Sequence, residues 1–156
     1  MTVYRVTDQA YVASPLDGEG ARLHGGRWNS KGLALAYTSQ NLSLAMLEIL
    51  VNLEDESVFD AFVFFEVQVP DELIAVPGTT PGVPAIPTDW NQGNRVLARN
   101  YGDRWAKNGS SLALRVPSAV NPIEANILIN VRHADFARVT IGASQPLDLD
   151  PRLLSR

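Results

Sequence analysis

Short apolar segments recur along this chain, and glycine or proline separates most of them. The longest covers residues 60–69 (DAFVFFEVQV) and is expected to form a central strand. Further strands are expected at 3–6, 33–38, 111–116, 127–129, 138–141 and 147–149. Because 46% of the 156 residues are hydrophobic and no internal repeat is present, the sequence predicts one compact domain over residues 1–156, with a sizeable core.

Residues 42–53 carry the clearest helical pattern. Its apolar side chains recur three and four positions apart, at Leu42, Met46, Ile49 and Leu53. Ser39 or Asn41 is a candidate N-cap. Nearly the whole circumference of this helix is apolar, and Glu48 and Asn52 form a narrow polar stripe. We therefore expect a mostly buried helix in which Glu48 either faces a water-filled cleft or has an internal partner such as an arginine.

The middle of the chain is less regular. Five of the ten prolines lie between residues 70 and 87, which indicates an irregular connection rather than a floating linker. Residues 90–107 then show a weaker amphipathic helical pattern, interrupted by Gly93 and Gly102.

Composition and charge argue against several classes of function. The chain has no cysteine and only two histidines, His24 and His133, so neither a disulfide framework nor a metal site is expected. A net charge of -4 makes direct binding of nucleic acid, and with it a nuclease, the least favoured function. No apolar run approaches the roughly 20 residues that span a bilayer, and the N-terminus is unlike a signal peptide. We expect a cytoplasmic protein without a membrane segment.

Three polar residues stand out against apolar or glycine-rich surroundings. Arg27 lies in a loop that holds five of the 11 glycines, and Tyr37 ends an apolar segment. Glu48 lies on the mostly apolar helix expected at residues 42–53. An arginine can anchor a diphosphate, a tyrosine ring can stack on a heterocycle, and a carboxylate can stabilise a sugar cation. Together they suit cleavage of a bond between a base and a ribose. Each also has a structural interpretation: a solvated arginine, a core tyrosine and an internally paired glutamate.

Four stretches closely resemble the RES-domain family, the toxin half of bacterial Xre–RES toxin–antitoxin pairs. They are GEGARLHGGRWNSKGLALAYTSQNLSLAMLEIL, LRVPSAV, EANILINVRH and DLDPRLL, which occur in the family's order between about residues 4 and 152. The family is named for an arginine, a glutamate and a serine, which here would be Arg27, Glu48 and Ser118. One departure is Val131, where the family favours proline, so the turn before His133 is expected to differ.

The resemblance implies an α+β fold, with a twisted β-sheet core and surrounding helices as in ADP-ribosyltransferases of the diphtheria-toxin kind. It also implies an enzyme that takes NAD as substrate, without a metal. Such an enzyme cleaves the nicotinamide–ribose bond by hydrolysis or phosphorolysis, which depletes NAD and arrests growth, or it transfers ADP-ribose to a protein. Its partner would be an Xre-type helix-turn-helix antitoxin that supplies the DNA contact, and the toxin could be a homodimer within that complex.

By the same resemblance, the NAD cleft would contain Arg27, Tyr37, Glu48 and Ser118, with Asn126 in support. Further NAD contacts would come from the loop motif, at Trp28, Asn29 and Lys31. The expected mechanism places Glu48 against an oxocarbenium-like ribose and Arg27 on the diphosphate, with Tyr37 as a wall for nicotinamide. Ser118 and Asn126 would orient the nicotinamide ring through hydrogen bonds.

Several alternatives stay open at this point. The acceptor of ADP-ribose could be water, phosphate or a specific protein, and the sequence does not separate them. A catalytically silent, antitoxin-binding module is a further alternative, weakened by the joint presence of the arginine, glutamate and serine. His24 is expected to be a solvated loop residue, and His133 to make a structural hydrogen bond after a strand.

Overall fold

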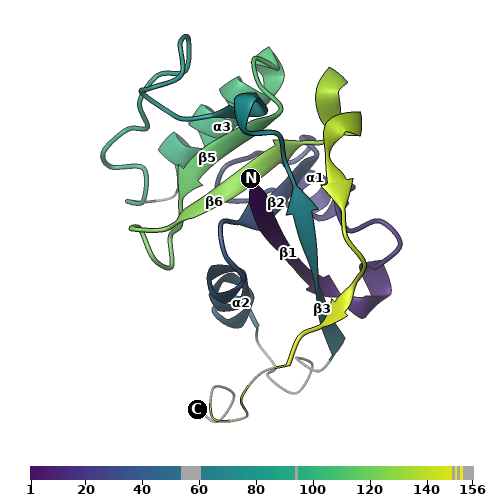
Figure 1. Ribbon diagram of the computed structural model, residues 1–156. Coiled ribbons are helices and arrows are strands. Elements are labelled where there is room, and N and C mark those ends of the chain that lie inside the picture. Colours follow the sequence, from purple (N-terminus) through teal and green to yellow (C-terminus); the bar gives the residue numbers. More distant parts are fainter. Residues whose placement is uncertain (54–60, 94, 149, 151, 153–156) are drawn as a thin grey trace.

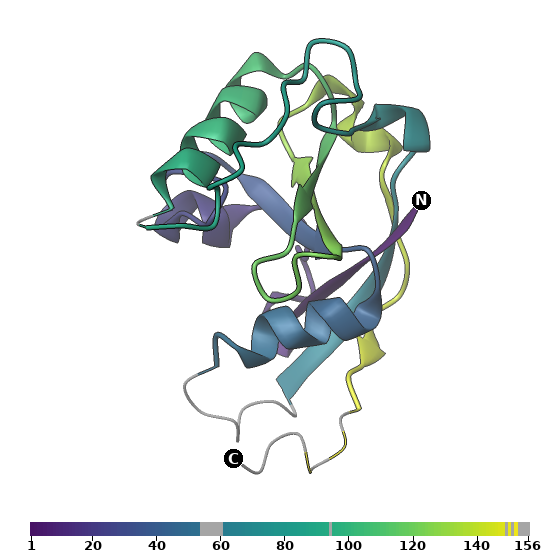
Figure 2. The same ribbon diagram turned by 90° about the vertical axis from the view of Figure 1, so that its left-hand side faces the viewer.

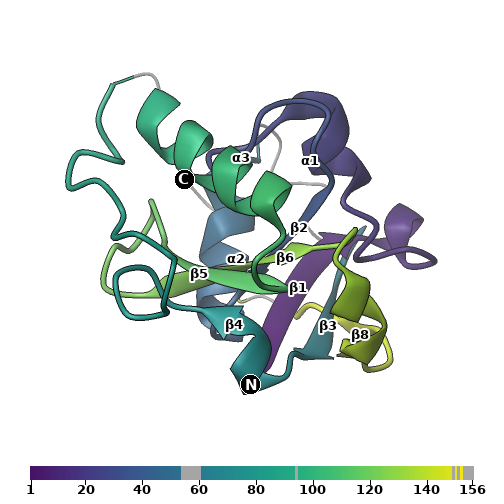
Figure 3. The same cartoon turned by 90° about the horizontal axis from the view of Figure 1, so that it is seen from above.

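The computed structural model describes residues 1–53, 61–93, 95–148, 150 and 152. Its strands form one mixed sheet in the order β4-β5-β6-β2-β1-β3-β7, with β8 also paired to β3. The strands are β1 (Thr2–Asp8), β2 (Leu35–Ser39), β3 (Phe62–Gln68), β4 (Ile74–Ala75), β5 (Ala113–Pro117), β6 (Ala125–Asn130), β7 (Thr140–Ile141) and β8 (Gln145–Pro146). Figure 3 shows β5 and β6 running across β1 and β3, so the sheet is strongly twisted.

The sheet is nearly divided between β1 and β2. These two strands pair at a single position, Tyr4 with Ser39, whereas β1 pairs with β3 over seven positions and β2 with β6 over five. Beyond Tyr4 the two strands diverge, and the Arg5 side chain bridges the gap. Its Nη1 donates to the Tyr37 carbonyl oxygen at 3.1 Å, and its Nε donates to the Pro15 carbonyl oxygen at 3.1 Å.

In the described part of the chain, three α-helices lie around the sheet: α1 (Glu19–His24), α2 (Leu42–Leu50) and α3 (Val96–Asn108) (Figure 1). Short 3₁₀ helices occur at Gln9–Tyr11, Asp71–Leu73 and Ala134–Arg138. Asn41 caps α2, because its Oδ1 accepts a hydrogen bond from the Leu44 backbone N–H at 2.7 Å. Within the described ranges, no helix is long and apolar enough to cross a membrane.

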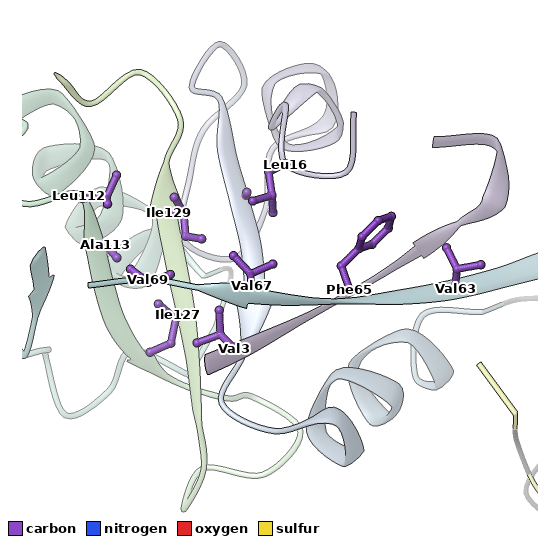
Figure 4. Packing of buried hydrophobic residues seen from close by; sticks show 11 residues of the cluster. Val3, Leu16, Val63, Phe65, Val67, Val69, Leu112, Ala113, Ile127 and Ile129 are labelled. Carbon is purple, nitrogen blue, oxygen red and sulfur yellow. The ribbon is translucent and has the colours of Figure 1, made fainter. Parts of the chain in front are cut away.

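Alternating residues of β6 supply two hydrophobic clusters. Ile127 and Ile129 pack with β1 and β3 residues such as Val3 and Phe65 (Figure 4). Leu128 instead joins the cluster that contains α3 and Trp28. Because successive side chains of a strand point to opposite faces, one fully buried strand serves both clusters. The expected α+β fold is confirmed.

The predicted burial of the helix at 42–53 is wrong. The α2 helix ends at Leu50, and only Leu44 and Ala45 are buried, while Leu47 and Val51 are 40% and 53% exposed. The helix packs against β1 and β2. An apolar circumference therefore did not mean burial on all sides.

Other predicted elements are shifted. The strand at 60–69 is confirmed over Phe62–Gln68, with residue 60 outside the described ranges, but β3 is second from the edge of the strand order while β2 is at its centre. Arg138 ends a 3₁₀ helix, so β7 is shorter than the predicted strand at 138–141. The strand expected at 147–149 falls instead on Gln145–Pro146, and residue 149 is not described. The helix expected at 90–107 begins only at Val96, after a run of turns.

Candidate active site

The α2 helix lies beside the β5–β6 connection (Figure 2), and a hydrogen-bonded carboxylate, Glu48, joins α2 to Ser118 and Asn126. Glu48 Oε1 accepts a hydrogen bond from Ser118 Oγ at 2.7 Å and another from Asn126 Nδ2 at 2.6 Å. Among the described residues, no donor contacts Glu48 Oε2 and no cation forms an ion pair with Glu48. The arginine partner considered as the structural alternative is therefore not found. One carboxylate oxygen is fixed, and the other is left for a ligand.

The amide of Asn126 is itself held in one orientation. Ser39 Oγ donates to Asn126 Oδ1 at 2.8 Å, so the amide NH2 group is turned toward Glu48. Ser39 and Asn126 are directly paired across β2 and β6, and both are buried. Sequence reasoning missed Ser39, because a serine that ends a strand carries no signal of this role.

Ser118 is a fully buried residue whose hydroxyl makes three hydrogen bonds. Besides donating to Glu48, its Oγ accepts from the backbone N–H groups of Val120 and Asn121 at 3.0 and 3.1 Å. The hydroxyl proton therefore points at the carboxylate. This arrangement suits a residue that positions Glu48, because the hydroxyl donates its proton to the carboxylate and both of its lone pairs accept from backbone N–H groups.

Glu48 lines a small pocket of about 70 Å³ at the divergence of β1 and β2. Tyr37 and Asn126 line it as well, together with Arg5, which the sequence analysis missed. Arg5 is the charged residue of an otherwise apolar strand segment, and that was the available signal. Burial lowers the pKa of the Arg5 guanidinium, and Asp17 opposes this effect. Arg5 also lines a larger hollow of about 450 Å³, so it is common to both.

The hydroxyl of Tyr37 is used within the protein. It donates to Asn29 Oδ1 at 2.8 Å and accepts from the Trp28 backbone N–H at 3.1 Å. Burial raises the pKa of Tyr37 well above the usual tyrosine value, so the phenol is neutral. A Cβ at Gly26 would collide with this hydroxyl, which explains a glycine there. The tyrosine ring is the part that remains for the pocket.

Trp28 and Asn29 lie beneath Tyr37 and not on the surface of a cleft. Trp28 is 2% exposed and Asn29 is 0% exposed. The Asn29 amide NH2 is shared among three carbonyl oxygens of the same loop and the adjoining helix. Neither side chain presents a surface to a ligand, so the direct NAD contacts expected of them are not what the structure shows. Their contacts fix the loop and the Tyr37 hydroxyl.

The α3 helix clamps the same loop. The carboxylate of Asp103 accepts from the Ser30 backbone N–H at 2.7 Å and from Ser30 Oγ at 2.6 Å. Gly102 packs directly on the Trp28 backbone, where a Cβ would overlap the Trp28 carbonyl oxygen. Gly102 is thus a close helix–loop contact, not merely an interruption of the helical pattern.

Arg27 lies in the loop before β2 and is half-buried, and among the described residues it makes no hydrogen bond to Glu48. Its Nη1 donates to Asn91 Oδ1 at 2.8 Å, and its guanidinium carbon lies 5.8 Å from the centre of the Trp90 ring. Partial burial, and next the charge of Arg95, lower the pKa of Arg27, while Glu48 raises it. Arg27 and Glu48 therefore interact electrostatically without a direct contact.

The remaining candidates have simpler surroundings. Lys31 is exposed, and so is His24. His133 Nδ1 accepts from the Asp135 backbone N–H at 3.1 Å at the start of a 3₁₀ helix, the structural kind of hydrogen bond expected of it. The described residues contain no group of three histidine, aspartate or glutamate side chains that could hold a metal ion.

Comparisons with known proteins give a consistent result. The RES domain model matches residues 2–150. A Toxin Res from Yersinia enterocolitica is 38% identical, over 98% of this chain and 99% of its own. A Toxin Res from Photorhabdus laumondii is 33% identical, over 99% and 97% of the two chains. A Prs ADP-ribosylating toxin from a Sphingobium species is 34% identical, over 95% and 92%.

The fold also has a solved counterpart. A chain in the crystal structure of the M. tuberculosis MbcT–MbcA toxin–antitoxin complex superposes with a TM-score of 0.71 at 24% identity. That likeness covers 98% of this chain and 86% of the other, and it supports the fold alone. The family model and the three curated relatives each match nearly the whole chain, as the sequence motifs predict, and this protein therefore belongs to the RES-domain family.

Proposed function

We propose that this protein is the toxin of a toxin–antitoxin pair and that it cleaves NAD at the bond between nicotinamide and ribose. The observation that carries the proposal is the Glu48 carboxylate, held through one oxygen by Ser118 and Asn126 beside a pocket walled by Tyr37. The names of the relatives, two Toxin Res proteins and an ADP-ribosylating toxin, support it.

Glu48 supplies the negative charge that this reaction needs. When the bond breaks, its electron pair goes to the nicotinamide nitrogen, which becomes neutral, and the ribose becomes a positively charged oxocarbenium ion. A carboxylate fixed in advance stabilises that ion without having to reorganise. Its unoccupied Oε2 either faces the cation or accepts a hydrogen bond from a ribose hydroxyl. Water or phosphate then adds to the cation, and a water nucleophile releases its proton to solvent.

The hydrogen bonds of the site change the roles first expected of Ser118 and Asn126. Both donate to Glu48, so they position the carboxylate rather than the nicotinamide ring. Trp28 and Asn29 likewise act through Tyr37, whose ring forms a wall for nicotinamide.

The cationic residues of the site serve the diphosphate of NAD. Arg27 binds it through its forked guanidinium, which fixes the ribose against Glu48. Arg5 lines the same pocket as Glu48 and is a further proposed contact. Lys31, with its exposed side chain, is a contact at the rim.

Transfer of ADP-ribose to a specific protein is the second candidate. It is favoured by one observation, the 34% identity to a protein named as a Prs ADP-ribosylating toxin. The same glutamate would stabilise the same cation, and only the group that captures it would differ. The choice between the two reactions depends on what reaches the ribose from the rim of the pocket.

We propose an antitoxin as the protein partner. The structural neighbour was solved as a toxin–antitoxin complex, which supports a partner of this kind. An Xre-type helix-turn-helix protein would supply the DNA contact for which a chain of net charge -4 is poorly suited. A homodimer of the toxin within that complex remains part of the proposal.

The test is incubation of the purified, antitoxin-free protein with NAD, with and without phosphate, followed by mass spectrometry. Nicotinamide with ADP-ribose indicates hydrolysis, and nicotinamide with ADP-ribose phosphate indicates phosphorolysis. Release that depends on added cell extract indicates a protein acceptor. If NAD survives every condition while the protein is folded, the enzyme proposal fails and a silent antitoxin-binding module replaces it.

A further inference from the structure

The side chain of Arg27 is held by a segment far away in the sequence. Asn91 Oδ1 accepts a hydrogen bond from Arg27 Nη1 at 2.8 Å, and the guanidinium carbon lies 5.8 Å from the ring centre of Trp90. Both contacts come from the turns that precede α3. An arginine side chain has many rotamers, and two contacts from one segment restrict them.

The segment that provides these contacts is itself anchored. Trp90 stacks on the buried Trp28 at a centroid distance of 5.2 Å and an interplanar angle of 23°. The Trp90 and Gln92 backbone N–H groups donate to the carbonyl oxygens of Pro87 and Asp89. Farther back, the Tyr101 hydroxyl of α3 donates to the Pro84 carbonyl oxygen at 2.5 Å. The acceptor on Asn91 therefore belongs to a fixed part of the fold.

The acceptor is also neutral. Arg27 has five N–H donors, and among the described residues only Nη1 has a hydrogen-bond acceptor. No described carboxylate forms an ion pair with it. A neutral amide orients the guanidinium while it leaves the charge and most donors available, whereas a carboxylate would compete with an anionic ligand.

We propose that Asn91 and Trp90 are positioning residues that hold Arg27 ready for the diphosphate of NAD. This inference rests on the proposed function, because it concerns the substrate of that site. The affinity for NAD is therefore expected to depend on Asn91, an exposed residue outside the pocket that contains Glu48.

The first experiment measures KM and kcat for nicotinamide release by the full-length protein. Asn91→Ala is expected to raise the KM for NAD about tenfold, the usual effect of losing a hydrogen bond to a charged group, with kcat changed by less than about twofold. Asn91→Asp is expected to raise KM further, because its carboxylate pairs with Arg27. Gln92→Glu is the matched control, since it adds the same charge one residue away at another exposed position and should leave KM unchanged.

The outcomes separate the inference from the proposed function. An unchanged KM in Asn91→Ala, or equal KM values in Asn91→Asp and Gln92→Glu, would overturn the inference. If the wild-type protein does not consume NAD, the side-chain NMR signals of Arg27 decide instead, assigned by their loss in Arg27→Lys. A held guanidinium gives resolved Nη signals that Asn91→Ala averages. Signals that are identical in both proteins would refute positioning by Asn91.

Discussion

A methyl group added at Gly102 is expected to disturb the candidate site without altering any side chain in it. A Cβ at this position would overlap the carbonyl oxygen of Trp28, so backbone meets backbone and α3 must move from the loop. Overpacking of this kind costs about 1–3 kcal/mol. For a domain of this size each kcal/mol lowers Tm by about 2–4 °C, so Gly102→Ala should lower Tm by about 2–12 °C.

The functional loss in Gly102→Ala should exceed the loss of stability. Trp28 donates its backbone N–H to the Tyr37 hydroxyl and stacks on Trp90, so a displaced Trp28 disturbs both sides of the site. We expect a reduced kcat/KM for NAD even at temperatures far below Tm, where the variant is fully folded. Calorimetry gives Tm, and nicotinamide release gives kcat/KM.

Gly20→Ala is the matched control for this prediction. Gly20 lies in α1 with ordinary backbone angles and no atom within 4 Å of an added Cβ. Alanine favours a helix by up to about 1 kcal/mol over glycine, so Tm should stay the same or rise. A Gly102→Ala protein that matched Gly20→Ala in Tm and in kcat/KM would show that the helix–loop contact has no role.

Three further changes test the site directly. Glu48→Gln keeps an oxygen that accepts from Ser118 and Asn126 but removes the charge. We expect kcat to fall about 10²–10³-fold with little change in Tm. Unimpaired turnover would remove the carboxylate from the mechanism. Ser39→Ala leaves the buried Asn126 oxygen without its donor, which should cost about 1–3 kcal/mol of stability and lower kcat. Ser39→Thr keeps a hydroxyl and should restore both the stability and kcat. Failure of that rescue would count against a role for the hydroxyl. Arg27→Ala should raise the Kd for NAD in a binding assay and the KM for NAD in a turnover assay, each about 10–100-fold. Unchanged values would contradict anchoring of the diphosphate.

The strands were largely predictable because β3, β5 and β6 are apolar runs bounded by turn residues. Their neighbours were not, since pairing depends on long-range contacts that a local pattern does not contain. The burial of α2 was overestimated for a related reason. An apolar circumference indicates how many sides of a helix could be buried. The number of elements that pack against the helix decides how many sides are actually buried.

Several members of the candidate site were predictable, but Ser39, Arg5 and the contacts among the members were not. The motifs identified Glu48, Ser118 and Asn126, but only the structure shows that two of them donate to the third. Trp28 and Asn29 are part of the same motif for a different reason, because they form the buried base of the loop. A motif thus marks residues that must be present together without separating ligand contacts from the supports of those contacts.

The register between β2 and β6 is what turns these separate supports into one site. Ser39 and Asn126 are direct partners across the pair, and Ser39 is also the only residue of β2 that pairs with β1. A shift of one residue would turn Asn126 to the other face of the sheet, away from Glu48, and would exchange Ile127 and Leu128 between two hydrophobic clusters that are packed around different side chains. The hydrophobic core therefore excludes the registers in which the carboxylate would lose its donor. The stability of the sheet and the orientation of Glu48 depend on the same strand pairing. The hydrogen bonds from Ser39 to Asn126 and from Asn126 to Glu48 therefore hold together a site whose residues come from α2, β2 and β6.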